Sequence, residues 1–265
     1  MNCITLNNGV EMPILGYGTY QIPPSITQQC VTNALEIGYR SIDTAQCYGN
    51  EREVGLACRK SGIARSELFI TTKLWACRGY RDTLRSIDDS LEKLNLDYID
   101  LLLIHEPTGD VREIYRAMEN AYKGGKVRSI GVSNFLEAKY LDLLKHCTIV
   151  PAVNQVETHV FRQQKKLREL ELQNGTKHES WSPLACGQNN IFGNSTLLEI
   201  AANHGKTVAQ IALRFLSQQE ITIIPKSVHT ERMRENFASL KFDLTADEIR
   251  EIERLEVGKS LFGWW

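Results

Sequence analysis

Short apolar runs alternate with amphipathic segments along the whole chain. The runs are predicted to be eight strands, at residues 14–20, 41–43, 68–74, 98–105, 127–133, 150–155, 177–181 and 221–227. The run at 98–105 is almost continuously apolar, which is typical of a parallel strand buried on both faces. Between the runs, apolar residues recur at helical spacing; before the fourth run they are Leu84, Ile87, Leu91 and Leu94.

Three sequences of the capping-box type predict helix starts. They lie at residues 25–28 (SITQ), 207–210 (TVAQ) and 245–248 (TADE). The TADE helix would follow the eighth strand and the helix after that strand. It is therefore predicted as an extra C-terminal helix, outside the strand–helix repeat.

Eight strand–helix repeats predict an α/β fold of the (β/α)8 barrel type, formed by residues 1–265 as a single domain. The alternative is an open, doubly wound sheet with a glycine-rich phosphate turn. Its only candidate fingerprint is Gly16-Tyr17-Gly18. This sequence lacks a third glycine and is followed by Ile22-Pro23-Pro24 before any helix can start. The barrel is therefore the favoured prediction.

Composition narrows the class of protein. The 265 residues carry 31 Lys plus Arg against 32 Asp plus Glu, which argues against a nucleic-acid binder or a polybasic membrane anchor. No apolar run approaches the roughly 18–20 residues of a membrane span, and the N-terminus lacks a signal-peptide pattern. Seven cysteines without a C-x-x-C pair indicate reduced thiols, no metal site and a cytoplasmic location.

Polar residues follow several predicted strands, where a barrel gathers its chemistry. Taken singly, Asp43 could be a helix cap, Tyr48 a packing residue and His105 a core histidine. Lys73 is harder to explain structurally, because an apolar run rarely ends in an inward lysine without a compensating charge.

Together, Asp43, Tyr48, Lys73 and His105 form a coherent proton-transfer set. A nearby ammonium group lowers the pKa of a tyrosine, and an aspartate would keep the ammonium group charged. Such a tyrosine can protonate a developing alkoxide, while a neutral histidine donates a hydrogen bond to the same oxygen. Alternatively, Lys73 could form a Schiff base, but Asp43 would oppose the neutral amine that this needs.

The eighth run suggests an anion site. Lys226 and Ser227 precede a helix predicted to start near Thr230, and Arg232 lies in its first turn. Free backbone N–H groups and these side chains suit a phosphate, although a solvated basic helix start is the simpler alternative. Trp181, at the end of the seventh run, could stack on a planar ring or could belong to the core.

Seven motifs in order resemble the aldo-keto reductase family over nearly the whole chain. They are GYRSIDTAQCYGNE (38–51), TTKLW (71–75), SLEKLNLDYIDLLLIH (90–105), GVSNF (131–135), PAVNQVE (151–157), SWSPLACG (180–187) and IPKSV (224–228) with Arg232, Glu235 and Asn236 downstream. The small bacterial members, of the diketogluconate-reductase type, are the most similar.

The resemblance implies a barrel whose lower end is closed by a hairpin at residues 4–12, and an NADPH cofactor. Tyr48 would be the general acid, tuned by Asp43 and Lys73, and His105 would orient the carbonyl of a small substrate. The implied cofactor residues are Thr19, Ser133, Asn134, Gln155, Trp181, Ser182, Leu184, Cys186, Lys226, Ser227, Val228, Arg232, Glu235 and Asn236.

One departure from the family pattern concerns the substrate pocket. The family most often has tryptophan where this chain has Glu106. We expect the carboxylate to disfavour bulky apolar aldehydes, and to favour the imidazolium form of His105 if it approaches that ring; it could instead face solvent. Tyr20, Trp75 and Trp264 or Trp265 would line an open mouth of broad specificity. Members of the family are usually monomers, and we expect the same here. The alternative function is that of a non-catalytic barrel protein that binds the cofactor.

Overall fold

Eight parallel strands form the central sheet of the computed structural model, which describes residues 2–263. In spatial order the strands run from β3 to β10, each hydrogen-bonded to the next along the chain. They are β3 (Tyr17–Gly18), β4 (Ser41–Asp43), β5 (Phe69–Leu74), β6 (Leu101–Ile104), β7 (Ile130–Ser133), β8 (Val153–Glu157), β9 (Lys177–Trp181) and β10 (Thr222–Ile223). Leu15 also pairs in parallel with Ile223, so the two edges meet and the sheet closes. The predicted (β/α)8 barrel is confirmed.

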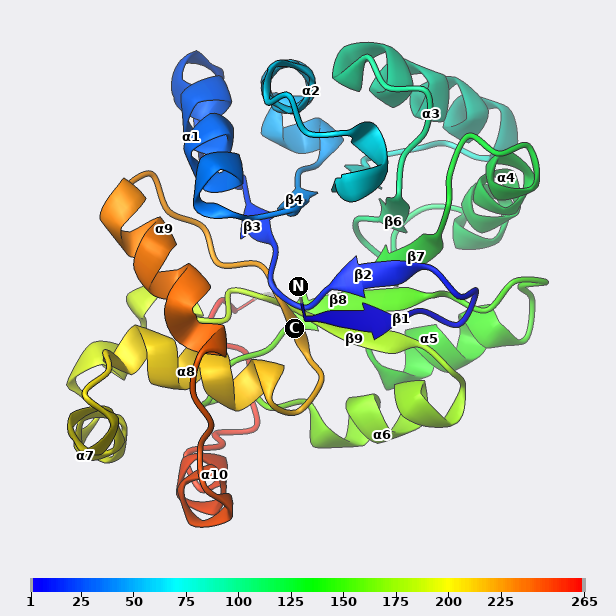
Figure 1. The fold of residues 1–265 in the computed structure, drawn as a ribbon. Coiled ribbons are helices and arrows are strands. Elements are labelled where there is room, and N and C mark those ends of the chain that lie inside the picture. The colour runs from blue at the N-terminus through cyan, green and yellow to red at the C-terminus, as the bar shows by residue number, and fades with distance from the viewer. Residues whose placement is uncertain (1, 264–265) are drawn as a thin grey trace.

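Helices alternate with the strands and surround them (Figure 1). They are α1 (Pro24–Ile37), α2 (Glu51–Lys60), α3 (Tyr80–Leu94), α4 (Val111–Lys123), α5 (Glu137–Leu144), α6 (Lys165–Gln173), α7 (Ser195–His204), α8 (Val208–Ser217), α9 (Thr230–Phe237) and α10 (Ala246–Glu253). Helix α10 is the predicted extra helix, and α7 is a further helix between β9 and β10. No helix within residues 2–263 is both long and apolar enough to cross a membrane.

The glycines of the candidate phosphate turn serve barrel closure. A Cβ atom at Gly18 would lie 2.7 Å from the carbonyl oxygen of Ile224. A Cβ at Gly16 would lie 3.0 Å from both the Ile224 and the Ser41 side chains. These glycines therefore let β3 approach the β10 segment closely, which explains the pattern without a bound phosphate.

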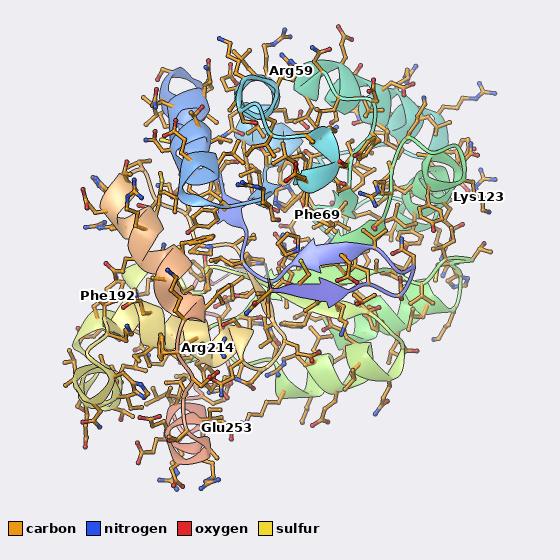
Figure 2. The ribbon with its side chains drawn as sticks, in the orientation of Figure 1. Arg59, Phe69, Lys123, Phe192, Arg214 and Glu253 are labelled. Atoms are coloured by element: carbon orange, nitrogen blue, oxygen red, sulfur yellow. The ribbon has the colours of Figure 1, made fainter. Side chains whose placement is uncertain are left out.

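A two-stranded hairpin, β1 (Cys3–Thr5) and β2 (Glu11–Pro13), crosses one end of the barrel (Figure 1). Its buried Ile4 and Met12 belong to the same apolar cluster as Phe69 and Leu101, whose side chains lie at that end of the strands. Figure 2 shows Phe69 next to the hairpin, inside the ring of helices. The hairpin thus closes the lower end, as predicted, and leaves the C-terminal ends of the strands as the open end.

Two of the three predicted capping boxes are present. Thr207 and Thr245 each accept a hydrogen bond from the backbone three residues on, and the return bonds from Gln210 and Glu248 complete both boxes. The prediction at 25–28 is wrong, because α1 begins at Pro24 and has no side-chain cap. A proline at the first helical position already has the right φ and lacks the N–H that a cap would satisfy.

Candidate active site

A buried ion pair lies at the centre of the barrel mouth. Lys73, near the end of β5, donates to Oδ1 of Asp43, the last residue of β4, over 2.6 Å. Both side chains are almost fully buried. The pair is possible because β4 and β5 are adjacent parallel strands whose carboxyl ends meet at the same edge. The compensating charge that the sequence required for an inward lysine is therefore present.

Tyr48 completes the hydrogen-bond capacity of the ammonium group. It ends the short 3₁₀ turn Gln46–Tyr48 that follows β4, and the chain turns away at Gly49 with a left-handed φ of 69°. The three hydrogens of Lys73 Nζ have acceptors at Asp43 Oδ1, at the Thr44 carbonyl (3.1 Å) and at the Tyr48 hydroxyl (3.4 Å). One donor thus points at the phenolic oxygen.

Charge and burial set the protonation states of Lys73 and Tyr48. Burial alone would lower the pKa of Lys73, but Asp43 and Tyr48 outweigh it, and the pKa lies above its ordinary value. For Tyr48, burial raises the pKa and Lys73 lowers it, with burial the larger effect. Lys73 thus lowers the pKa of Tyr48 as expected, but the pKa still lies above its ordinary value. Tyr48 is therefore a protonated hydroxyl beside a permanent cation.

His105 follows β6 and borders the same space. Its ring centroid lies 5.7 Å from that of Tyr48 and 5.2 Å from that of Trp75. Burial and the charge of Lys73 lower the pKa of His105 to about 3, so the ring is neutral near pH 7. The Cys47 sulfur lies 3.4 Å from Nδ1, and burial raises the pKa of this thiol. An S–H donated to Nδ1 leaves the ring hydrogen on Nε2.

A second buried carboxyl group lies below the ion pair, and sequence reasoning missed it. Gln155 Nε2 donates to Asp43 Oδ2 and to Glu179 Oε2, both over 3.0 Å. Burial and the charge of Asp43 raise the pKa of Glu179. Its position two residues before Trp181 on a predicted strand could have revealed it, had inward positions been considered along with strand ends.

Glu106 is half-buried, and its carboxyl group bonds to Asn134, which neither of the two sequence alternatives foresaw. Its Oε1 accepts from Asn134 Nδ2 over 2.9 Å, and Asn134 Oδ1 accepts from Trp181 Nε1 over 2.8 Å. Burial raises the pKa of Glu106 to about 7, although the Asn134 bond opposes this shift. A chain of hydrogen bonds therefore joins the ends of β6, β7 and β9.

The predicted phosphate site lies where β10 leads into α9. Lys226 and Arg232 are exposed there, while Ser227 is buried and accepts from the backbone N–H of His229. Tyr17 donates to the Ser227 carbonyl and so fixes this turn against β3. Of the other predicted cofactor residues along this turn and helix, Val228 is half-buried, Asn236 is buried and Glu235 accepts from the Thr207 hydroxyl (2.5 Å).

The remaining predicted residues surround the mouth. Tyr20 and Trp75 are each 48% exposed, and the Tyr20 ring lies 5.0 Å from that of Tyr48. Thr19 is buried and donates to the Asp43 carbonyl, and Ser133 is the buried last residue of β7.

The loop after β9 holds three more of the predicted residues. Ser182 and Cys186 have left-handed φ angles and contact each other over 3.2 Å, with Leu184 between them in the sequence. Trp264 and Trp265 lie outside the described residues.

Comparison with known proteins identifies the family of this chain. The family model described as "Aldo/keto reductase family" matches residues 14–257. The chain belongs to the aldo-keto reductase family. A reductase of prostaglandin H2 9,11-endoperoxide from Trypanosoma cruzi is 44% identical over 99% of this chain and 94% of its own length. The glyoxal reductase of Bacillus subtilis is also 44% identical, covering 95% and 92%.

Solved structures agree with this assignment. The crystal structure of MGS-M4, an aldo-keto reductase from a deep-sea metagenome library of the Medee basin, superimposes with a TM-score of 0.96. It is 44% identical, over 98% of this chain and 97% of that one. The protein is thus an oxidoreductase of this family. Among residues 2–263, no group of three or more His, Cys, Asp or Glu side chains is placed to hold a metal ion.

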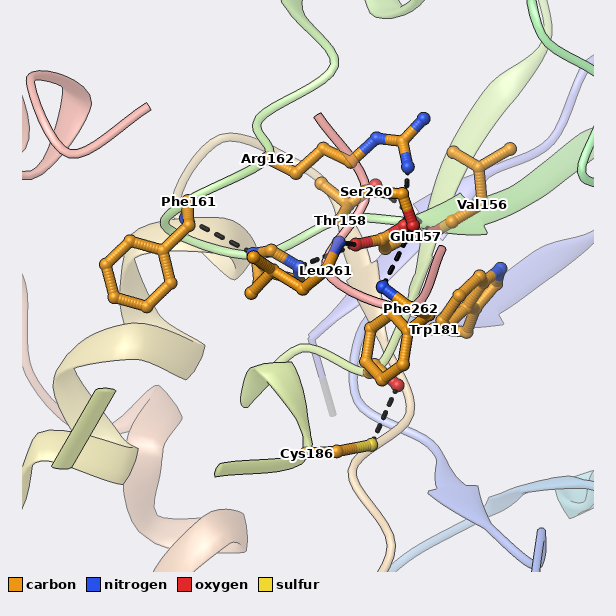
Figure 3. Close-up of polar contacts among 12 residues, drawn as sticks. Val156, Glu157, Thr158, Phe161, Arg162, Trp181, Cys186, Ser260, Leu261 and Phe262 are labelled. Atoms are coloured by element: carbon orange, nitrogen blue, oxygen red, sulfur yellow. Dashed lines mark hydrogen bonds and ion pairs between the residues drawn. The ribbon is translucent and has the colours of Figure 1, made fainter. Parts of the chain in front are cut away.

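The C-terminal segment of this aldo-keto reductase reaches the site through a buried carboxylate that sequence reasoning also missed. Glu157, the last residue of β8, accepts from Arg162 (2.5 Å), His159 (3.0 Å) and the backbone N–H of Leu261 (3.0 Å). The hydroxyl of Ser260 joins them (Figure 3). Glu157 pairs in register with Trp181. The anchored segment therefore places Phe262 against that indole, with ring centroids 5.2 Å apart.

Proposed function

We propose that the protein reduces small aldehydes and ketones to alcohols with NADPH. The observation that carries the proposal is the arrangement of Asp43, Lys73 and Tyr48, with neutral His105 at the edge of the tyrosine ring. A protonated phenol, a cation directed at its oxygen and a neutral imidazole converge on one opening. These are the groups that carbonyl reduction requires.

The residues present fit a dinucleotide. The half-buried Trp181 offers an aromatic surface at the mouth, and exposed Lys226 and Arg232 lie beside the start of α9, where the helix dipole favours a phosphate. We assign Trp181, Ser133, Asn134 and Gln155 to the nicotinamide half. Lys226, Ser227 and Arg232 would hold the 2′-phosphate, with Glu235 and Asn236 toward the adenine. When bound, NADPH supplies a hydride to the carbonyl carbon.

The proton comes from Tyr48. As negative charge develops on the carbonyl oxygen, the phenolic hydrogen passes to it, because an alkoxide is a much stronger base than a phenolate. The phenolate left behind lies 3.4 Å from Lys73 Nζ, whose charge stabilises it. Asp43 holds that ammonium group in place over 2.6 Å. The high pKa of Lys73 also argues against the Schiff-base alternative, which needs a neutral amine.

His105 orients the substrate. With Cys47 donating to Nδ1, the Nε2–H is free to donate to the carbonyl oxygen, which polarises the bond toward hydride attack. The exposed rings of Tyr20 and Trp75 border the entrance and suit small carbonyl compounds. The likeness to a protein named glyoxal reductase supports the same substrate class.

The test is the loss of NADPH absorbance with dicarbonyls, aromatic aldehydes, keto-sugars and cationic aldehydes, repeated with NADH. Tyr48→Phe should lower kcat by a factor of about 10² or more, the lower range for general acid catalysis, while NADPH still binds. Tyr98→Phe, which removes a hydroxyl just before β6 where Tyr98 packs on Arg65, is the matched control. Full activity of Tyr48→Phe would refute the mechanism. Tight NADPH binding without turnover of any carbonyl would favour a non-catalytic, cofactor-binding protein.

A further inference from the structure

Glu106 occupies an unusual position, at the end of a hydrogen-bond chain that leads to the aromatic surface of the proposed cofactor site. The chain runs from Glu106 after β6, through Asn134 after β7, to Trp181 at the end of β9. Its two links measure 2.9 and 2.8 Å. The hydrogen-bond chain therefore crosses the ends of three strands at the mouth of the barrel.

The hydrogen-bond capacity of Asn134 fixes the orientation of its amide. One Nδ2 hydrogen points to Glu106 Oε1 and the other to the carbonyl oxygen of His105, 3.3 Å away. Oδ1 accepts the indole N–H of Trp181 and keeps one lone pair. A flipped amide would set Nδ2 against the indole N–H and Oδ1 against the Glu106 carboxyl, so both contacts would become repulsive.

The backbone at Asn134 also needs support from its neighbours. Asn134 has a left-handed φ of 64°, a conformation that asparagine tolerates better than most residues. Asn134 is 5% exposed, so an amide hydrogen that lost its acceptor here would not find water easily. Glu106 supplies the shorter of the two bonds that Nδ2 donates, and therefore helps to fix which way this amide faces.

We infer that Glu106 is a positioning residue that holds Asn134, and through it Trp181, in the orientation that receives the nicotinamide ring and its carboxamide. The inference rests on the proposed function. The remaining lone pair of Asn134 Oδ1 would accept a carboxamide N–H, while the tethered indole presents its face to the ring. Glu106 thus acts on cofactor binding, beyond any effect on the substrate.

The surroundings of Glu106 supply a conservative variant. Its Oε2 atom is buried and has no hydrogen-bond partner among residues 2–263. The side chain borders a cavity of about 60 Å³ that is also lined by Trp75, Cys77 and Thr108. Glu106→Gln can keep an oxygen toward Asn134 and turn its NH₂ group into this space, whereas Glu106→Leu keeps the bulk and removes the acceptor.

The experiment measures dissociation constants of the full chain for NADPH and for adenosine 2′,5′-bisphosphate, which lacks the nicotinamide. Glu106→Leu should weaken NADPH binding about 10-fold, the effect of one buried hydrogen bond, and leave bisphosphate binding unchanged. Glu106→Gln should stay within about twofold of the wild type for both ligands. Thr108→Ala, which changes another side chain of the same cavity and keeps the Glu106–Asn134 bond, is the matched control and should bind both ligands normally.

A charge-swapped pair tests the link directly, even where Glu106→Leu fails to fold. Asn134→Asp sets two carboxyl groups against each other and should weaken NADPH binding about 10-fold. Adding Glu106→Gln restores one donor and one acceptor with reversed roles, and should recover most of that loss.

Three results would overturn the inference: unchanged NADPH affinity in Glu106→Leu, equal weakening of both ligands, or no recovery in the double variant. Wild-type protein that binds NADPH but reduces no carbonyl would instead refute the proposed activity and leave the role of Glu106 in binding intact.

Discussion

Replacing Glu157 by glutamine should destabilise the protein and release its C-terminal segment. The carboxylate is 2% exposed and accepts from Arg162, His159 and the Leu261 backbone. Figure 3 shows Arg162 and Leu261 converging on Glu157 from two parts of the chain. An amide of the same shape keeps one acceptor oxygen but presents an NH₂ group to donors and leaves Arg162 without its counter-ion.

The magnitude follows from the pKa of Glu157. Burial would raise this pKa, but the hydrogen bonds from His159, Ser260 and Leu261 and the charge of Arg162 outweigh it and lower the pKa from 4.5 to about 2. A shift of that size corresponds to about 3 kcal/mol of folding free energy at pH 7. Because the folded-state pKa is depressed, this contribution is complete above about pH 4.5 and is lost as the pH falls toward 2.

Urea unfolding of the wild type and Glu157→Gln measures the effect. At pH 7 the variant should lose about 3 kcal/mol. At pH 4 the gap should narrow by about 0.8 kcal/mol, because the Glu157 carboxyl of the unfolded wild-type chain takes up a proton there while the folded-state carboxylate stays ionised. Glu251→Gln, the same change at an exposed position of α10, should stay within about 0.5 kcal/mol of the wild type. A loss below about 1 kcal/mol at pH 7, or a gap that does not depend on pH, would refute the reasoning.

Two further predictions concern the proposed chemistry. Lys226→Ala removes an exposed cation beside α9 and should weaken NADPH binding about 10-fold while NADH binding changes less than twofold, as measured by equilibrium titration; equal weakening of both would contradict the 2′-phosphate assignment. Cys47→Ala removes the donor to His105 Nδ1 and should lower kcat/KM for carbonyl substrates about threefold at unchanged NADPH affinity, by steady-state kinetics and titration; unchanged kcat/KM would show that the thiol does not orient the ring.

The periodicity of apolar residues and the local turn chemistry were sufficient to predict the barrel architecture from the sequence. The alternation of short runs with helical segments predicted all eight barrel strands. Most of the runs are apolar, because a strand covered by helices on one side and by the barrel interior on the other is buried on both faces; β9, with His178 and Glu179 buried, is an exception. The capping boxes at Thr207 and Thr245 were readable because both partners lie within one helical turn. The one at 25–28 failed because the prolines before it determine where α1 begins.

Strand lengths were less predictable. The apolar run at 98–105 predicted a longer strand than β6, which spans Leu101–Ile104. The run at 221–227 likewise yields only the two residues of β10. An apolar residue marks burial, whereas the extent of a strand depends on hydrogen bonds with neighbours far away in the chain. The sequence therefore locates each strand without defining its ends.

The sequence by itself determined the barrel and the polar residues that follow the strands, because each depends on patterns within a few residues; the closing hairpin was implied only by the resemblance to the family. Tertiary structure alone decided the partners of those polar groups. Gln155 joins Asp43 to Glu179, Cys47 contacts His105, and Glu157 anchors a segment that begins about a hundred residues later. A side chain bonds to whichever donor or acceptor the closed barrel brings within about 3 Å, and no local pattern records that choice.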